Sequence, residues 1–376
     1  MKKVLIVFGT RPEAIKMAPL VKRLSESNHF VVKICSTGQH QDILDEVLKI
    51  FDIHLDYELN VFEHQQSLGK LGSRIMHRLA GLFEVESFDL VLVHGDTQTT
   101  VMAALAAFQA KIPVAHVEAG LRSGSRMNPW PEEVNRRLTT QLSEIHFAPT
   151  IENKNFLISD GVESNNIFVT GNTVIDALKE TLRVNQSDSE FKRIFDKKYP
   201  VFGETAPLVL VTMHRRENHG KNISDVCDAI KKLADNNIAN FFVTLHPNPA
   251  VRNPIISKLE SMNNVILANP LDYREFCEAM KRSDIIMTDS GGIQEEAPSL
   301  KKPVLVLRQN TERTEAVLAG TVELVGTDTD HIVKRVTSIL SSSMEMERFV
   351  CSDNPYGAGD ASAKIENSLN MLLRQG

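Results

Sequence analysis

Short apolar runs rich in Val and Ile alternate with helix-period segments along the whole chain, and this alternation limits the possible folds most strongly. The runs are Val4–Phe8, Val31–Cys35, Leu90–Val93, Val114–Val117, Ile145–Ala148, Ile167–Val169, Leu208–Val211, Phe241–Leu245, Val265–Leu267, Ile285–Met287, Val304–Leu307 and Val322–Val325. Continuous runs of this kind suit strands that are buried on both faces. Between the first two runs, the apolar residues recur at helical spacing: Ala14, Met17, Ala18, Val21 and Leu24. The pattern predicts parallel sheets covered by helices on both faces.

The alternation runs through the chain twice, which predicts an α/β protein with two Rossmann-like domains. A length of 376 residues fits the same number, because one domain takes roughly 100–200 residues. The junction falls near Gly171-Asn172 or in the polar stretch Asn185–Lys198, and we place the domains at residues 1–171 and 172–356. Residues 357–376 contain Ile365, Leu369 and Leu372 at helical spacing and predict a terminal helix that must dock on a domain.

Composition and missing motifs exclude several function classes. The net charge of −6 argues mildly against a nucleic-acid partner. The four cysteines form no CxxC pair, and no Cys/His spacing predicts a metal. No GxGxxG follows the first strand and no Walker sequence occurs, so we expect no bound NAD or ATP. The apolar run near Met1 is too short for a signal peptide, and no stretch reaches the ~20 apolar residues of a membrane span. We therefore expect a cytoplasmic protein without a membrane partner.

Polar groups follow many of the predicted strands, at the carboxyl ends where open α/β sheets bind ligands. They are Gly9-Thr10-Arg11, His94-Gly95-Asp96, His116, Glu118, His214-Arg215-Arg216, His246 and Asp289-Ser290-Gly291-Gly292. Two domains whose polar edges face each other would enclose a cleft that excludes water.

Two strand-to-helix junctions have the features of phosphate sites. Ser290 is a good N-cap, and Gly291 and Gly292 allow a ligand to approach the backbone of the helix N-terminus. Arg11, with Lys16 about one turn further on, is placed to reach a diphosphate. The plainer interpretations are an ordinary strand-to-helix turn and a solvated basic pair.

The remaining candidates are acidic residues and one histidine. Asp96 and Glu118 follow two predicted strands; two such carboxylates are costly to hold together unless they share a proton or a cation. Such pairs occur in acid–base sites, although both residues could instead cap the next helices. Glu132 follows Trp130-Pro131 at a helix start, where the dipole alone explains an acid. His214, beside two arginines, favours an anion, and a surface salt-bridge cluster is the alternative.

These motifs together resemble one family. The matching segments are Phe8–Lys16, Val93–Thr97, His116–Arg122, Pro129–Glu133, Thr170–Ala177, His214–Asn218 and Thr288–Pro298. In this order and over essentially the whole chain, they are similar to the non-hydrolysing UDP-N-acetylglucosamine 2-epimerases of bacteria. Each segment alone is weak, but the combination is very specific.

The resemblance implies the two-domain architecture that many glycosyltransferases also use, with the terminal helix packed back on the first domain and a homodimeric assembly. It implies that UDP binds the second domain and that no cofactor is needed. The implied catalytic residues are Asp96, Glu118, Glu132 and His214. The implied substrate-binding residues are Arg11, Lys16, Leu271, Phe276, Ser290, Gly291, Gly292, Glu296 and Arg313, with Leu271 and Phe276 at the uracil and Glu296 at the ribose.

The sequence departs from the family pattern in places. Gly38-Gln39-His40-Gln41-Asp42 stands where Ala-Gln-His-Arg is common, and Thr314 replaces a usual proline. In many bacterial members a second substrate molecule binds beside the first and activates the enzyme. Gln39, Arg215 and His246 match that regulatory site, whereas Asp42 replaces a usual glutamine.

The implied reaction is reversible conversion of UDP-N-acetylglucosamine into UDP-N-acetylmannosamine, a precursor for cell-surface polysaccharides. The C2 hydrogen is not next to a carbonyl, so inversion needs either transient oxidation or elimination of UDP. The sequence carries no nicotinamide signature, which favours elimination. The alternatives are a hydrolysing epimerase that releases N-acetylmannosamine, an epimerase of another UDP-2-acetamido sugar, a glycosyltransferase of the same architecture and a non-catalytic UDP-sugar sensor.

Overall fold

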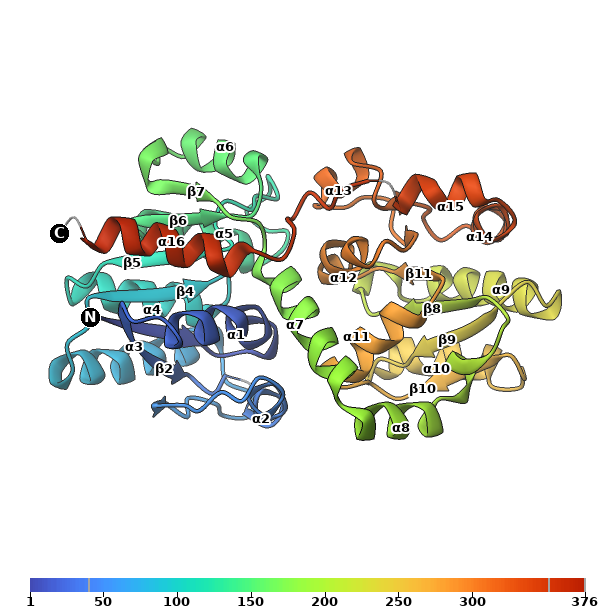
Figure 1. Cartoon of the computed structure of the whole chain (residues 1–376), viewed down its shortest axis with the longest axis horizontal. Helices are drawn as coiled ribbons and strands as arrows, with labels where there is room; N and C mark the ends of the chain where they lie inside the picture. The colour runs from blue at the N-terminus through green and yellow to red at the C-terminus, as the bar shows by residue number, and fades with distance from the viewer. Residues whose placement is uncertain (40, 351, 375–376) are drawn as a thin grey trace. The chain divides into compact units, whose positions relative to one another are not determined.

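The computed structural model describes residues 1–39, 41–350 and 352–374, except for the side chains of residues 41–45 and 374. The chain forms two compact units, Met1–Glu180 together with Tyr356–Gly376, and Thr181–Pro355. The division lies inside helix α7 (Thr173–Ser187), between the two expected junctions at Gly171-Asn172 and Asn185–Lys198. Figure 1 shows a central sheet flanked by helices in each unit.

The first unit contains a parallel sheet. In the described residues it has seven strands in the order β3-β2-β1-β4-β5-β6-β7. The strands are β1 (Lys2–Phe8), β2 (Phe30–Ser36), β3 (Tyr57–Glu58), β4 (Leu90–His94), β5 (Val114–Val117), β6 (Ile145–Ala148) and β7 (Ile167–Val169). The connecting helices are α1 (Arg11–Ser25), α2 (Gln41–Ile50), α3 (Leu68–Val85), α4 (Gln98–Gln109), α5 (Glu132–Leu142), α6 (Ile151–Ser159) and the 3₁₀ turn η1 (Ser164–Asn166). This arrangement confirms the α/β prediction for this half of the chain.

The second unit repeats the plan. In its described part, six parallel strands lie in the order β10-β9-β8-β11-β12-β13. They are β8 (Leu208–Thr212), β9 (Asn240–Thr244), β10 (Val265–Ala268), β11 (Ile285–Thr288), β12 (Val304–Val306) and β13 (Glu323–Leu324). The helices are α8 (Ser189–Lys198), α9 (Lys221–Asp235), α10 (Pro249–Leu259), α11 (Tyr273–Arg282), α12 (Gly291–Glu296), α13 (Thr314–Leu318), α14 (Thr329–Ser341) and α15 (Ser343–Val350), with 3₁₀ turns η2 (Pro200–Gly203), η3 (Arg216–Asn218) and η4 (Ala297–Leu300).

Burial explains why the apolar runs become strands. All side chains of Val4–Phe8 in β1 are fully buried, as are those of Val209–Val211 in β8. The spaced apolar residues of α1, including Met17 and Leu24, cover the sheet with no more than a few per cent exposure. Strand β3 was not predicted, because two residues at a sheet edge are too short to give a periodic signal.

The terminal helix α16 (Ala361–Arg374) packs against α1 within the first unit, and Figure 1 shows the two side by side. Ile365 and Leu369 are fully buried, and Arg23 pairs with Glu366 at 2.6 Å. The Asp176 carboxylate accepts the backbone N–H groups of Ala361 and Ser362, where α16 begins. These contacts attach the chain end to the unit that contains its beginning.

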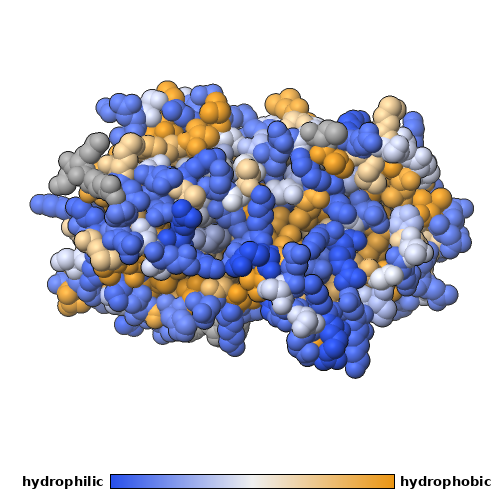
Figure 2. Space-filling model, in the orientation of Figure 1, coloured by the Kyte–Doolittle hydropathy of each residue, from blue (hydrophilic) through white to orange (hydrophobic). Residues whose placement is uncertain are grey.

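Hydrophilic side chains predominate on the face in Figure 2, with apolar residues scattered among them. Among the described residues, no helix is long and apolar enough to cross a membrane.

Candidate active site

The topology of the first unit predicts a ligand-binding crevice between the carboxyl ends of β1 and β4. The chain order reverses there, since β1 lies between β2 on one side and β4 on the other. Loops that leave adjacent parallel strands at such a point diverge and leave a crevice at the carboxyl ends. The loop after β1 leads into Arg11, the first residue of α1, and the loops after β4 and β5 carry Asp96 and Glu118 respectively.

Glu13 connects the first two of these loops. One of its carboxylate oxygens accepts the backbone N–H groups of Gly9 and Thr10, at 3.1 and 2.9 Å, and the Thr10 hydroxyl. The other oxygen accepts the hydroxyls of Thr97 and Thr100, at 2.7 and 3.1 Å. The side chain is 2% exposed, so the loops after β1 and β4 share one buried anchor.

Asp96 is paired with Arg136 of helix α5. The Arg136 guanidinium donates to Asp96 Oδ2 from Nε at 2.9 Å and lies at 2.7 Å through Nη2. The Asn135 amide donates to the Asp96 backbone carbonyl. Helix α4 takes Thr97 as its N-cap, so Asp96 is not the helix cap that the plainer interpretation required.

Glu118 is paired with a separate cation. Its Oε2 lies 2.5 Å from Lys16 Nζ, accepts the Asn172 amide at 2.8 Å and is 3.6 Å from His94 Nε2. Burial raises the pKa of the Glu118 carboxyl, but the charges of Lys16 and His94 and the hydrogen bond from Lys16 hold it well below its ordinary value. The residue has φ of 62°, a left-handed conformation that is uncommon for a side chain of this size. The carboxylate is therefore buried, ionised and placed by a strained backbone.

Two histidines under these loops differ in their contacts. His116 is fully buried, and its Nε2 lies 2.7 Å from the Gly95 carbonyl. Burial lowers the pKa of His116 to about 3, so the ring is neutral and donates that hydrogen bond. His94 is 3% exposed, and neither of its ring nitrogens has a hydrogen-bond partner among the described residues.

Helix α5 brings Glu132 and Glu133 to the same unit. Within the described part of the chain, the buried Oε2 of Glu132 has no hydrogen-bond partner. The adjacent Glu133 is fully buried; it accepts the Ser123 backbone N–H and pairs with Arg136 and Arg137. Glu133 holds the helix start and the Arg136 side chain, whereas Glu132 keeps an open acceptor.

In the second unit, the ends of β8 and β11 meet at Asp289. This carboxylate is fully buried and accepts the backbone N–H groups of His214 and Arg215 and the Asn218 amide. His214 Nδ1 lies 3.3 Å from Asp289 Oδ1. Burial lowers the pKa of His214, an effect that Asp289 opposes and that Arg215, His246 and Arg308 reinforce.

An arginine cluster lies beside the loop that follows β11. A side-chain carbon built on Gly291 would come 3.4 Å from the Arg313 guanidinium carbon and 3.5 Å from Arg215 Nη2. Glu312 lies against three arginines, at 3.3 Å from Arg215, 2.9 Å from Arg308 and 3.4 Å from Arg313. Burial raises the pKa of Glu312, but these charges bring it down to about 2. Glycine therefore leaves room for a group that contacts two guanidinium groups.

The remaining predicted substrate ligands lie in the same unit. Ser290 occupies the N-cap position of α12, but its hydroxyl makes no capping hydrogen bond. Glu296, at the end of α12, accepts the hydroxyl of the buried Tyr273 at 2.7 Å. Leu271 is buried in the loop before α11, and Phe276 is half-buried on that helix.

The predicted residues thus fall into two groups. Arg11, Lys16, Asp96, Glu118 and Glu132 belong to the first unit, and the His214, Ser290 and Arg313 regions belong to the second. Of the residues matched to a regulatory site, Gln39 accepts the Thr99 hydroxyl in the first unit, while His246 stacks on His214 in the second with ring centroids 6.0 Å apart. The side chain of Asp42 lies outside the described residues.

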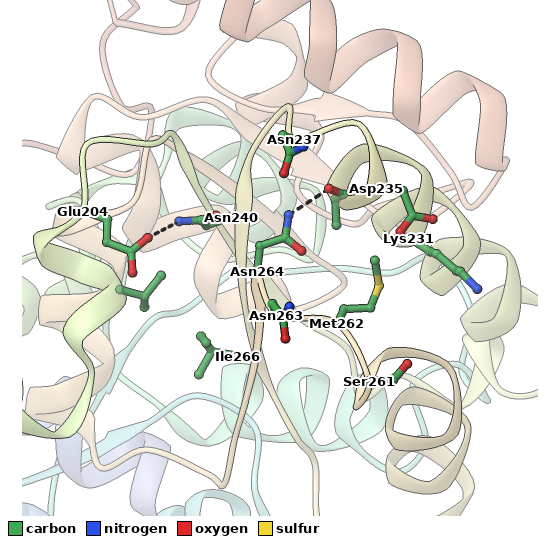
Figure 3. Close-up of a pocket in the computed structure, with 12 residues that line it drawn as sticks. Glu204, Lys231, Asp235, Asn237, Asn240, Ser261, Met262, Asn263, Asn264 and Ile266 are labelled. Atoms are coloured by element: carbon green, nitrogen blue, oxygen red, sulfur yellow. Dashed lines mark hydrogen bonds between the residues drawn. The ribbon is translucent and has the colours of Figure 1, made fainter.

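A surface cavity of about 550 Å³ lies at the opposite edge of the second sheet. Figure 3 shows its asparagine-rich lining: Asn237, Asn240, Asn263 and Asn264. These residues lie at or before the amino ends of β9 and β10, whereas His214 and Ser290 follow the carboxyl ends of β8 and β11. The cavity contains none of the predicted site residues.

Comparison with known proteins decides the family. The family described as UDP-N-acetylglucosamine 2-epimerase matches residues 22–370. The chain belongs to this family. The UDP-N-acetylglucosamine 2-epimerase of Neisseria meningitidis serogroup A is 48% identical over 98% of this chain and 99% of its own, and that of Escherichia coli K12 is 46% identical over 98% of each.

Solved structures of the family agree. The Neisseria meningitidis UDP-GlcNAc 2-epimerase bound to UDP-GlcNAc has a TM-score of 0.91 at 48% identity, covering 98% of this chain and 100% of that one. The Methanocaldococcus jannaschii enzyme in complex with UDP-GlcNAc and UDP has a TM-score of 0.81 at 33% identity, covering 98% and 99%. The resemblance seen in the motifs is confirmed: this chain is an epimerase with two Rossmann-like halves.

Sequence reasoning gave no role to several residues that organise the epimerase loops. They are Glu13, His94, Arg136, Asn172, Asp289, Arg308 and Glu312. Two had a readable signal: Glu13 follows Thr10 by three residues, which is the capping-box spacing, and Arg136 lies one helical turn after Glu133, with which it pairs. The partners of Asp289, and Arg215 among the partners of Glu312, lie far away in the sequence and give no local pattern.

Proposed function

We propose that this chain interconverts UDP-N-acetylglucosamine and UDP-N-acetylmannosamine by eliminating UDP and adding it back. The family membership supports the reaction class, and the relative from Neisseria meningitidis that is bound to UDP-GlcNAc supports the substrate. The observation that carries the proposal is the pair of carboxylates Asp96 and Glu118, each held by its own cation after neighbouring strands.

The elimination requires a base at C2 and a stabilised leaving group at C1. The C2 proton moves to an enzyme base while the C1–O bond breaks and its electron pair stays on the β-phosphate oxygen. A C1–C2 double bond forms in the sugar. When UDP returns to C1, a proton enters C2 from the opposite face, so the atoms balance and the configuration inverts.

The carboxylates of the first unit suit the proton transfers. The side chains of Asp96 and Glu118 are able to accept a proton or to stabilise the oxocarbenium-like charge that develops at C1. The buried Oε2 of Glu132 has no hydrogen-bond partner among the described residues and adds a third proton acceptor. We assign base, acid and electrostatic roles to these three residues jointly.

The second unit suits the UDP. The guanidinium groups of Arg215 and Arg313 flank Gly291, and they would stabilise the negative charge of a diphosphate leaving group bound there. The Ser290 hydroxyl makes no capping hydrogen bond and provides a further hydrogen-bond donor. His214 assists the departing diphosphate, Leu271 and Phe276 hold the uracil, and Glu296 holds the ribose. Arg11 and Lys16 add positive charge.

Product analysis tests the proposal. Purified protein is incubated with UDP-N-acetylglucosamine, and the products are followed by proton and phosphorus NMR, with Glu118→Gln as the inactive control. We expect a mixture of the two UDP-sugars without free N-acetylmannosamine. Release of the free sugar would identify a hydrolysing epimerase instead. Turnover of a different UDP-2-acetamido sugar, with UDP-N-acetylglucosamine left intact, would refute the proposed substrate.

We propose the cellular setting from the family resemblance. We place the enzyme in the cytoplasm as a homodimer that supplies N-acetylmannosamine units for surface polysaccharides. We also propose that Gln39, Arg215 and His246 hold a regulatory substrate molecule. A sigmoidal rate curve that becomes hyperbolic in Gln39→Ala would support this site, and hyperbolic kinetics in the unaltered enzyme would count against it.

A further inference from the structure

Asp289 is a fully buried carboxylate beside His214, the predicted catalytic residue of the second unit. It is 0% exposed and follows β11 directly. All its described donors come from the segment after β8: the backbone N–H groups of His214 and Arg215 and the amide of Asn218. Asn218 also donates to the Leu307 carbonyl after β12, so its side chain is held in turn. Asp289 therefore has a single rigid position.

The His214 ring lies against this fixed carboxylate. Its Nδ1 is 3.3 Å from Asp289 Oδ1, whereas its side chain remains 38% exposed. A carboxylate next to one imidazole nitrogen favours a proton on that nitrogen and stabilises the doubly protonated ring. The other charged and titratable groups that face His214 are Arg215, His246 and Arg308, and each of them disfavours the imidazolium.

We propose that Asp289 is a positioning residue that keeps a proton on His214 Nδ1 and supports the imidazolium form, leaving Nε2 to contact the diphosphate. The inference rests on the proposed function. As the C1–O bond breaks, the Nε2–H donates a hydrogen bond to the β-phosphate oxygen that receives the electron pair. When UDP returns, the same hydrogen bond is released. Asp289 acts only through His214 and does not touch the substrate.

The tautomer of His214 tests the proposal in the unaltered protein. Protein labelled with ¹⁵N-histidine is measured by NMR above pH 8, and the His214 signals are assigned by their loss in His214→Gln. The proposal expects Nδ1 to carry the proton and Nε2 to be bare. A proton on Nε2 would overturn it. This measurement needs no substrate and no variant of Asp289.

The second test is Asp289→Asn, which removes the charge with little change of shape. The midpoint of the His214 titration should fall by about one to two pH units, and the basic limb of the kcat profile should move to lower pH by the same amount. UDP affinity measured at pH 6 should change less than threefold. An unchanged His214 titration in a folded variant would refute the proposal.

The chain supplies a matched control at the other end of the same strands. Asp284 precedes β11 and accepts the Leu208 N–H of β8 at 2.8 Å, so Asp284→Asn also removes a carboxylate that joins these two strands. It should reduce stability without moving the His214 titration or the pH profile. Equal shifts in both variants would reduce Asp289 to a structural role.

The two proposals fail in different ways. A protein that does not convert UDP-N-acetylglucosamine, but shows the Nδ1–H tautomer and the shifted titration, would refute the proposed function and keep the Asp289–His214 pair. An active epimerase in which Asp289→Asn lowers kcat as strongly in the His214→Gln background as in the original would refute the inference alone, because Asp289 would then act independently of His214.

Discussion

Replacement of Lys16 by methionine tests whether Glu118 is a buried carboxylate that depends on its own cation. Lys16 and Glu118 are only 13% and 12% exposed, and their charged atoms are 2.5 Å apart. Methionine keeps most of the apolar stem and removes the charge. Glu118 would then remain buried beside His94 and Asn172, without the strongest group that lowers its pKa.

The expected cost follows from that burial. Removing one partner of a buried ion pair costs about 3–5 kcal/mol, because the remaining charge is uncompensated. Glu118 limits this loss by taking up a proton, so we expect about 3 kcal/mol at pH 7. In the unaltered protein the lowered pKa of Glu118 contributes stability above the pKa of the unfolded chain, and this stability is lost as pH falls through the folded pKa. The difference between the two proteins should therefore be large at pH 7 and shrink as pH falls below the pKa of the unfolded chain, about 4.3.

Urea unfolding followed by circular dichroism at several pH values measures this difference. Lys22→Met is the matched control, since Lys22 lies on the same helix and pairs with Glu180 at 2.7 Å with 47% exposure. An exposed pair of this kind contributes less than about 1 kcal/mol. The acid limb of the kcat profile should also rise by about one to three pH units in Lys16→Met alone. Equal costs for the two variants, or a difference that does not vary with pH, would refute the reasoning.

Three further predictions concern the site. Asp96→Asn and Glu118→Gln should each lower kcat by ~10²-fold or more while calorimetry finds nearly unchanged UDP affinity; normal turnover in both would leave them structural. Gly291→Ala puts a methyl group 3.4 Å from Arg313 and should weaken UDP binding, whereas Gly203→Ala, which meets nothing within 4 Å, should not; equal affinities would remove the diphosphate from this loop. Activity should survive chelator treatment without added nicotinamide, and recovery that needs a metal would contradict this.

Strands such as β1 and β8 were predictable because each is a continuous buried run. Val4–Phe8 and Val209–Val211 contain no polar residue, and none of their side chains is exposed. The sequence alone therefore indicates that these segments are buried. The short edge strand Tyr57–Glu58 has no such run, and its position depends on pairing with β2 rather than on its own residues. The fold class could therefore be predicted from the local sequence pattern, whereas the edge strand β3 could be located only in the tertiary structure.

The site was predictable only in part for a related reason. The sequence placed Asp96 and Glu118 at neighbouring strand ends and indicated that a cation or proton must compensate them. The structure supplies two cations, Lys16 and Arg136. From the sequence, Lys16 is placed only to reach a diphosphate. Arg136 lies 40 residues from Asp96, and no sequence spacing reveals a contact that the packing of α5 creates.

Isotope exchange tests the central proposal, elimination and return of UDP, most directly. The reaction is run in heavy water with an oxygen label in the bond between C1 and the β-phosphate. The account predicts deuterium at C2 of the product, deuterium in both epimers at long times, and movement of the label into the non-bridging oxygens of the β-phosphate. Product that carries neither C2 deuterium nor displaced label would contradict the account.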